Sequence, residues 1–115
     1  MIKLVPITVP MDGETGSSNG PRSNLQSRRI HDAIKKAFPN SKITFSKGHY
    51  FCSCFIRFSE TNVVYLMTSD YRFFPGEFIV RTAKHEKDYS GGVNNNYRGF
   101  EKILSAIAKV GGYNA

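Results

Sequence analysis

The chain of 115 residues is 40% hydrophobic and 13% aromatic, which is too apolar for a disordered protein and fits one folded domain over residues 1–115. No run of about 18 apolar residues occurs in it, so we expect no membrane span and no membrane partner. The formal charge of +7 favours an anionic partner, although it also suits a well-solvated surface.

The amino-terminal stretch MIKLVPITVP is interrupted by Pro6 and Pro10. It lacks the unbroken apolar core of a signal peptide, so we expect a cytoplasmic protein. The β-branched and apolar side chains of residues 2–9 predict a short edge strand. The Gly, Ser and Asn residues that follow predict a flexible loop at about residues 11–23.

A first helix is predicted from residue 23 to Phe38, because its apolar residues recur at the spacing of one helical face and Pro39 stops it. The outer face of this helix is basic. Most of the excess positive charge lies in or near it, in Arg22, Arg28, Arg29, Lys35, Lys36, Lys42 and Lys47. This concentration of charge makes a nucleic-acid-binding module our second functional hypothesis.

Four runs rich in β-branched and aromatic residues follow, SKITFS, HYFCSCFIRF, NVVYLMTSDYR and EFIVRTAKH, and they predict an antiparallel meander. After the segment DYSGGVNNNY (residues 88–97), apolar residues from Tyr97 to Ala108 recur with helical period. They predict a second helix that one of the three asparagines caps and that Gly111-Gly112 ends. The expected fold class is α+β, an antiparallel sheet of about four to five strands packed with two helices, in the order β-α-β-β-β-β-α.

The second predicted strand sorts its side chains onto two faces. Cys52 and Cys54 lie on the more apolar face, and we expect both to be reduced and buried, since residues two apart on a strand are poorly placed for a disulfide. Phe51, Phe55 and Arg57 lie on the other face. They predict a platform on which a base stacks beside a phosphate contact. A subunit interface or a second small core explains the same pattern.

The last predicted strand carries Arg81 and ends near Lys84 and His85, so cationic groups gather where the segment DYSGGVNNNY begins. His85, Asp88 and Tyr89 are close enough in sequence for an acid–base group. No recognised motif joins a nucleophile, a base and an orienting group, however, so we expect a protein that is not an enzyme. Two cysteines without further ligands at a suitable spacing also lead us to expect no metal and no cofactor.

The segment DYSGGVNNNY holds more polar groups than one helix cap requires. Glycines let backbone N–H groups approach a ligand closely, and asparagine side chains both donate and accept hydrogen bonds. We therefore expect Asp88 and Asn94 to bind the sugar or base edge of a ligand.

Two resemblances bear on function. The segment KGHYFCSCFIRF, in an order of helix, strands and helix, resembles a double-stranded-RNA-binding domain, a family that contacts phosphates through a lysine-rich start of its last helix. The segment at that position here is NNNYRGFEK, with Arg98 and Lys102. In size, basic charge and order of elements the whole chain is similar to small phage-encoded anti-defence proteins, especially the anti-Thoeris sponges. That resemblance implies a homo-oligomer that sequesters cyclic ADP-ribose-type signals without cleaving them, in a pocket at a subunit contact.

Our leading hypothesis is a non-enzymatic protein that binds a small phosphorylated ligand such as a cyclic nucleotide. The alternatives are the nucleic-acid-binding module and a protein inhibitor of a host defence complex. The expected ligand-binding residues combine cations, aromatic rings and hydrogen-bonding groups: Arg28, Phe51, Phe55, Arg57, Arg81, Lys84, Asp88 and Asn94.

Overall fold

A computed structural model of the chain describes residues 25–45, 51–70, 73–74 and 76–112. Its elements in chain order are α1 (Leu25–Ala37), β1 (Lys42–Phe45), β2 (Ser53–Ser59), β3 (Asn62–Thr68), β4 (Glu77–Ala83), β5 (Asn95–Arg98), the 3-10 helix η1 (Phe100–Lys102) and α2 (Ile103–Val110). This is the expected α+β class, with one antiparallel sheet of five strands and two α-helices. The predicted strand at residues 2–9 and the predicted loop at residues 11–23 lie outside the described residues.

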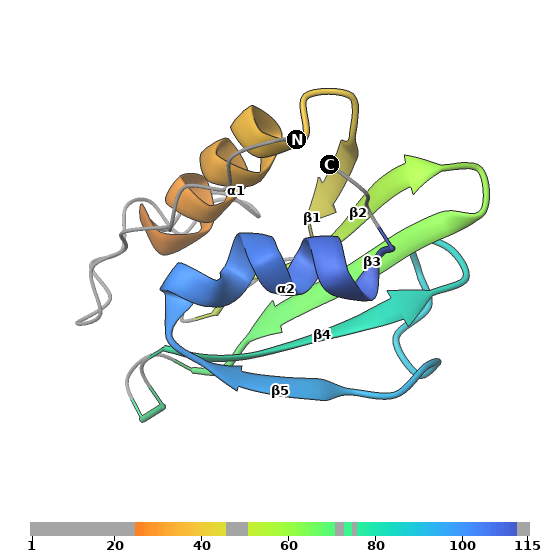
Figure 1. Cartoon of the computed structure of the whole chain (residues 1–115). Helices are drawn as coiled ribbons and strands as arrows, with labels where there is room; N and C mark the ends of the chain where they lie inside the picture. Colours follow the sequence, from red (N-terminus) through yellow and green to blue (C-terminus); the bar gives the residue numbers. More distant parts are fainter. Residues whose placement is uncertain (1–24, 46–50, 71–72, 75, 113–115) are drawn as a thin grey trace.

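The strands form a meander in which each strand pairs with the next one in the chain (Figure 1). The register puts Phe55 of β2 opposite Tyr65 of β3, and Tyr65 opposite Arg81 of β4. Because cross-strand partners project from the same face of a sheet, these three side chains form one row across its centre.

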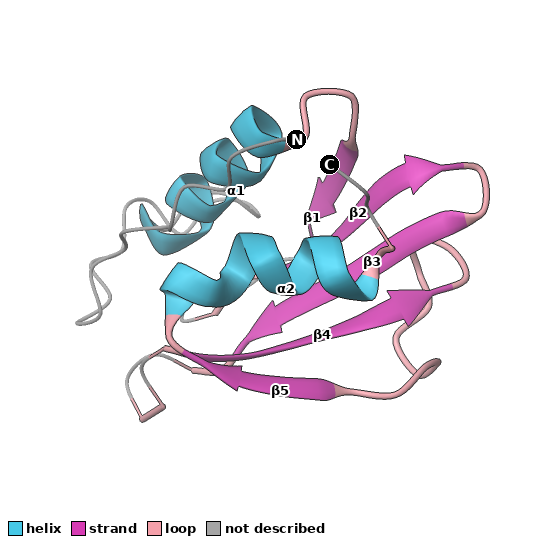
Figure 2. Cartoon of the chain, viewed as in Figure 1, coloured by secondary structure: helices cyan, strands magenta, loops and turns pink. Residues whose placement is uncertain are grey.

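Both α-helices pack on one face of the sheet (Figure 2). α1 and the residue just after it contribute Ile30, Ile34 and Phe38 to the core there, and α2 contributes Ile103 and Ile107. The strands supply Cys54, Ile56, Val64, Leu66, Phe78 and Val80. Burial of each large apolar side chain stabilises the fold by about 1.5–3 kcal/mol, so this face holds the main core. None of the helices in the described ranges is long and apolar enough to cross a membrane.

Cys52 and Cys54 are free and buried, as the sequence predicted. A hydrogen bond with Cys52 and burial together raise the pKa of the Cys54 thiol well above its ordinary value. Since the thiolate is the reactive form of cysteine, Cys54 acts as a small apolar core residue.

Residues Asn95–Arg98 form a strand, β5, where the sequence predicted the start of the second helix. β5 pairs with β4, and the ring of Tyr97 stacks on Phe78 with 5.2 Å between the ring centroids. The prediction of a helix start was wrong because sheet pairing and this ring contact outweigh the helical spacing of Tyr97. Helical structure begins only at Phe100, so none of the three asparagines caps it.

Gly99 makes the turn from β5 into the helix. Its φ is 103°, a conformation that residues with a Cβ rarely adopt. Its N–H donates a hydrogen bond of 2.7 Å to the carbonyl of Gly76, in the connection between β3 and β4. This bond ties the end of β5 to the neighbouring hairpin and so fixes where the last helix starts.

Replacing Gly99 with alanine is expected to lower the free energy of unfolding by about 2–3 kcal/mol, because its backbone conformation, φ 103° and ψ 112°, is one that residues with a Cβ rarely adopt. Gly112→Ala is the matched control, since Gly112 has a φ of 65° but nothing within 4 Å of an added Cβ. The control should lose about 1 kcal/mol. Urea unfolding followed by circular dichroism measures both losses, and equal losses would contradict this role for Gly99.

Candidate functional site

The face of the sheet turned away from the helices carries a second cluster of buried side chains. Its buried members are Phe55, Val63 and Tyr65, at 0%, 1% and 5% exposure. Three half-buried residues pack against them: Met67, Ile79 and Ala83. The connection between β4 and β5, residues 84–94, runs behind the sheet in the view of Figure 1 and contacts this cluster. We refer to this connection as the β4–β5 loop.

Tyr89 is the residue of the β4–β5 loop that covers the cluster. Its ring meets Phe55 edge-on at 5.2 Å and Tyr65 edge-on at 5.9 Å between ring centroids. The side chain of Tyr89 is nevertheless 57% exposed. The Tyr89 ring therefore covers part of the buried pair Phe55 and Tyr65 while its own outer side faces the solvent.

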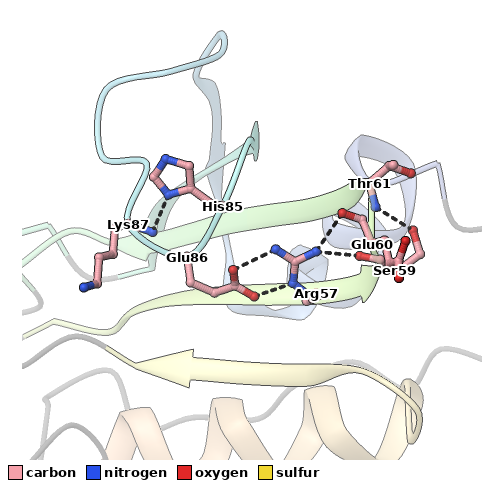
Figure 3. Close-up of polar contacts among 7 residues, drawn as sticks. All are labelled: Arg57, Ser59, Glu60, Thr61, His85, Glu86 and Lys87. Carbon is pink, nitrogen blue, oxygen red and sulfur yellow. Dashed lines mark hydrogen bonds and ion pairs between the residues drawn. The ribbon is translucent and has the colours of Figure 1, made fainter.

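An ion pair between Arg57 of β2 and Glu86 attaches the β4–β5 loop to the sheet (Figure 3). Arg57 Nε and Nη2 donate to the two Glu86 carboxylate oxygens at 2.5 and 2.8 Å. Arg57 Nη1 donates to the carbonyls of Ser59 and Glu60 at 2.8 and 2.9 Å. The hydrogen bonds from Arg57 lower the pKa of Glu86 from its ordinary 4.5 to about 2. Arg57 is thus neutralised within the protein.

Arg81 is buried beside the aromatic pair, at 3% exposure. Its Nη2 donates to the backbone carbonyl of Asp88 at 2.6 Å, and its Nη1 donates to the carbonyl of Thr82 at 3.2 Å. Its Cζ lies 4.5 Å from the centre of the Tyr65 ring, a cation–π geometry. Among the ion pairs found in the described ranges, none involves Arg81. Two carbonyls and a ring contact this cation directly, and the Asp88 carboxylate lies close enough for Arg81 to help lower its pKa.

Two hydroxyl groups complete the polar part of the cluster. The Ser53 and Tyr65 hydroxyls are hydrogen-bonded to each other at 2.8 Å, and both residues are buried. Burial raises the pKa of Tyr65, so its hydroxyl stays neutral and available as a donor.

Asp88 and the two glycines after it shape the β4–β5 loop. The Asp88 carboxylate accepts hydrogen bonds from the N–H groups of Lys84 at 2.9 Å and Gly91 at 2.9 Å, and the first of these contacts contributes most to lowering the pKa of Asp88. A Cβ on Gly91 would lie 2.5 Å from an Asp88 carboxylate oxygen. Gly92 has a φ of 75°, and a Cβ there would lie 2.7 Å from the Thr82 carbonyl. Asp88 was predicted to bind a ligand, whereas its carboxylate and both glycines have structural roles within the loop.

The structure brings together about half of the sequence-predicted site residues. Phe55, Arg57, Arg81 and Asp88 meet around the second cluster, and Lys84 lies exposed where the β4–β5 loop begins. Two predicted residues lie elsewhere: Arg28 is exposed on α1 at the opposite face of the sheet, and Asn94 is exposed just before β5. Phe51 is half-buried just before β2. Phe55 belongs to a second small core, as one of the alternatives held, and is too enclosed to serve as an open platform.

Three residues in or over the second cluster were not among the predicted ligand-binding residues: Tyr65, Glu86 and Tyr89. A signal for Tyr65 was present in the run NVVYLMT of β3, because apolar residues occupy both sets of alternating positions. Such a strand is buried on both faces, which requires a cover on the side away from the helices. Nothing in the spacing of Glu86 or Tyr89 indicates that the β4–β5 loop supplies that cover.

His85 and Asp88 use their side chains within the β4–β5 loop. The Asp88 carboxylate accepts backbone N–H groups, and the His85 ring nitrogen Nδ1 accepts the N–H of Lys87 at 3.1 Å. These contacts engage His85 and Asp88 separately rather than with each other. The groups buried beneath the loop are a cation, an aromatic pair and a hydrogen-bonded pair of hydroxyls.

No protein-family model matches the chain, and searches of the curated proteins and of the solved structures likewise find no match.

Glu86→Gln is expected to be less stable than the wild type near neutral pH, with a difference that disappears as the pH falls. Because the folded pKa of Glu86 is depressed, its ion pair stabilises the protein above the unfolded pKa of 4.5 and is lost as the pH approaches about 2. Urea unfolding at a series of pH values measures the difference between the two proteins. Glu101→Gln, at an exposed carboxylate, is the control and should show no such trend. A pH-independent difference for Glu86→Gln would argue against the ion pair.

Proposed function

We propose that the protein binds a small phosphorylated ligand without cleaving it, and that Arg81 is the main phosphate contact. The observation that carries this proposal is a cation at 3% exposure whose hydrogen-bond acceptors are two backbone carbonyls. Among the described residues no carboxylate hydrogen-bonds to Arg81, and the Asp88 carboxylate acts on it only at longer range, so this buried guanidinium still gains from a negative charge in direct contact. A phosphate at Arg81 would supply that charge through charge-assisted hydrogen bonds.

The surroundings of Arg81 support the same chemistry. Tyr65 lies under the guanidinium, and the hydroxyls of Ser53 and Tyr65, hydrogen-bonded to each other, lie on the same face. Arg57 is satisfied by Glu86, so it contributes little further positive charge to an incoming ligand. Lys84 is exposed at the start of the β4–β5 loop and is the second cation that we assign to the ligand.

The specific ligand that we propose is a cyclic nucleotide or a cyclic ADP-ribose-type immune signal, sequestered by a homo-oligomer acting as a phage anti-defence sponge. This part of the proposal rests on the resemblance in size, charge and order of elements. The chemistry around Arg81 supports only the broader class, a small ligand that carries phosphate.

Titration calorimetry against cyclic ADP-ribose isomers, cyclic dinucleotides and pyrophosphate tests the proposal. Arg81→Met is expected to weaken binding about 10- to 100-fold, because it removes two charge-assisted hydrogen bonds while keeping an unbranched side chain over Tyr65. Arg98→Met is the control, since Arg98 is 80% exposed on β5, and it should leave the affinity unchanged. Absence of binding by the wild type across the whole panel would refute the proposal.

A second candidate function is nucleic-acid binding by the outer face of α1. Arg28, Arg29 and Lys36 are exposed there, and none of them takes part in the ion pairs found among the described residues. Asp32, the acidic residue of this face, is paired with His31 at 3.0 Å. The face therefore presents a cationic surface suited to phosphate groups.

Replacing Arg28, Arg29 and Lys36 together with glutamine is expected to weaken binding to nucleic acid and to reduce the slope of log affinity against log salt by about 2–3. Fluorescence anisotropy with labelled duplex RNA and single-stranded DNA at several salt concentrations measures both effects. The control replaces Lys87, Arg98 and Lys109, which are exposed outside α1. An unchanged slope in the α1 variant, or an equal effect in the control, would exclude this face as the binding surface.

A further inference from the structure

Two consecutive residues of the β4–β5 loop make the contacts that a nucleotide would make at this site. The backbone carbonyl of Asp88 accepts a hydrogen bond from Arg81 Nη2 at 2.6 Å. The ring of the next residue, Tyr89, lies against Phe55 and Tyr65 at 5.2 and 5.9 Å. The carbonyl that accepts from Arg81 and the ring that contacts the aromatic pair thus belong to adjacent residues, Asp88 and Tyr89.

We infer that Asp88 and Tyr89 occupy the place of the ligand, and that the site binds a nucleotide whose phosphate replaces the Asp88 carbonyl and whose base replaces the Tyr89 ring. This inference rests on the proposed function and narrows the ligand from any phosphorylated molecule to one with an aromatic base close to its phosphate. The β4–β5 loop then acts as an internal competitor that a ligand must displace.

The strengths of the contacts support displacement at both positions. A phosphate oxygen carries charge and makes a stronger hydrogen bond to a buried guanidinium than a neutral carbonyl does. A base that enters edge-on or stacked against Phe55 and Tyr65 replaces a ring that is itself 57% exposed. The loop therefore gives up little buried area at Tyr89 when it moves.

The construction of the loop limits where it moves. The Arg57–Glu86 ion pair holds its first part to β2, and the Asp88 carboxylate holds residues 84–91 in one turn. Gly92 follows that turn with a φ of 75°, and Asn95 then anchors the chain by donating to the carbonyl of Val80 at 3.0 Å. Displacement of Tyr89 is expected to loosen the turn around Asp88, including its hydrogen bonds from Ser90 and Gly91, while Glu86 and Asn95 stay anchored on either side.

The test compares Tyr89→Ala with the wild type in titrations with adenosine monophosphate, cyclic ADP-ribose and ribose 5-phosphate. Removing the competing ring should tighten binding of the two base-containing ligands about tenfold, and should tighten ribose 5-phosphate much less, because only a base uses the vacated contacts. Val93→Ala is the matched control in the same loop, at an apolar side chain that is 80% exposed, and should leave all three affinities unchanged.

A second measurement uses the unmodified protein and does not depend on how the variant folds. Hydrogen exchange of residues 84–94 should become faster when adenosine monophosphate or cyclic ADP-ribose binds, since Ser90 and Gly91 N–H groups are now held by the Asp88 carboxylate.

The outcomes separate the two claims. If the wild type binds a phosphorylated ligand but Tyr89→Ala binds it equally or more weakly, or exchange in the loop slows on binding, Tyr89 does not stand in for a base and this inference fails while the proposed function stands. If neither the wild type nor Tyr89→Ala binds any of these three ligands or any cyclic dinucleotide or pyrophosphate, the proposed function fails and this inference with it.

Discussion

Strands β2 and β3 bury apolar side chains on both faces of the sheet, and this constraint shapes the rest of the described structure. On one face Cys54, Ile56 and Leu66 pack under the helices, and on the other Phe55 and Tyr65 are buried just as completely. Both α-helices lie on the first face (Figure 2). The β4–β5 loop covers the second face. The ion pair, the turn and the glycines of that loop hold it in place over the sheet.

Burying the second face also encloses charge. The row that crosses the sheet runs from Phe55 through Tyr65 to Arg81, so whatever covers the two rings covers the guanidinium as well. The two arginines of this face, Arg57 and Arg81, differ in the groups that accept their hydrogen bonds. Arg57, near the rim, receives a carboxylate from Glu86, whereas Arg81, at the centre, receives carbonyl oxygens. The Glu86 carboxylate thus contacts Arg57 directly, whereas the Asp88 carboxylate acts on Arg81 without a direct hydrogen bond.

Much of the architecture could be predicted from the sequence because it depends on local patterns. The apolar spacing around Ile30 and Ile34 marked α1, and four alternating or β-branched runs marked β1 to β4. Strand β5 was missed because its pairing with β4 and the stacking of Tyr97 on Phe78 are contacts between distant parts of the chain, which local spacing does not encode.

The candidate site was predicted in part for the same reason. Strand alternation correctly put Phe55 and Arg57 on one face, and it also identified Arg81 as a residue of interest. Whether those side chains are open or covered depends on where residues 84–94 fold. That segment has no periodic pattern, and its path is set by one ion pair, one carboxylate turn and two glycines. Composition alone does not show that the loop uses these groups for its own folding. For that reason the sequence led us to expect an uncovered binding face.

The way the β4–β5 loop is held distinguishes a cover that moves from one that is part of the core. A permanent cover gains most by inserting a fully buried side chain, because stabilisation scales with the apolar area removed from water. Here the firm attachments are polar and lie toward the two ends, at Glu86 and Asn95, while Tyr89 between them meets the rings only edge-on and stays more than half exposed. The loop is therefore internally ordered and anchored toward its ends, with a partly exposed ring at its centre. That arrangement supports the proposed exchange of the central contacts while the fold around them stays intact.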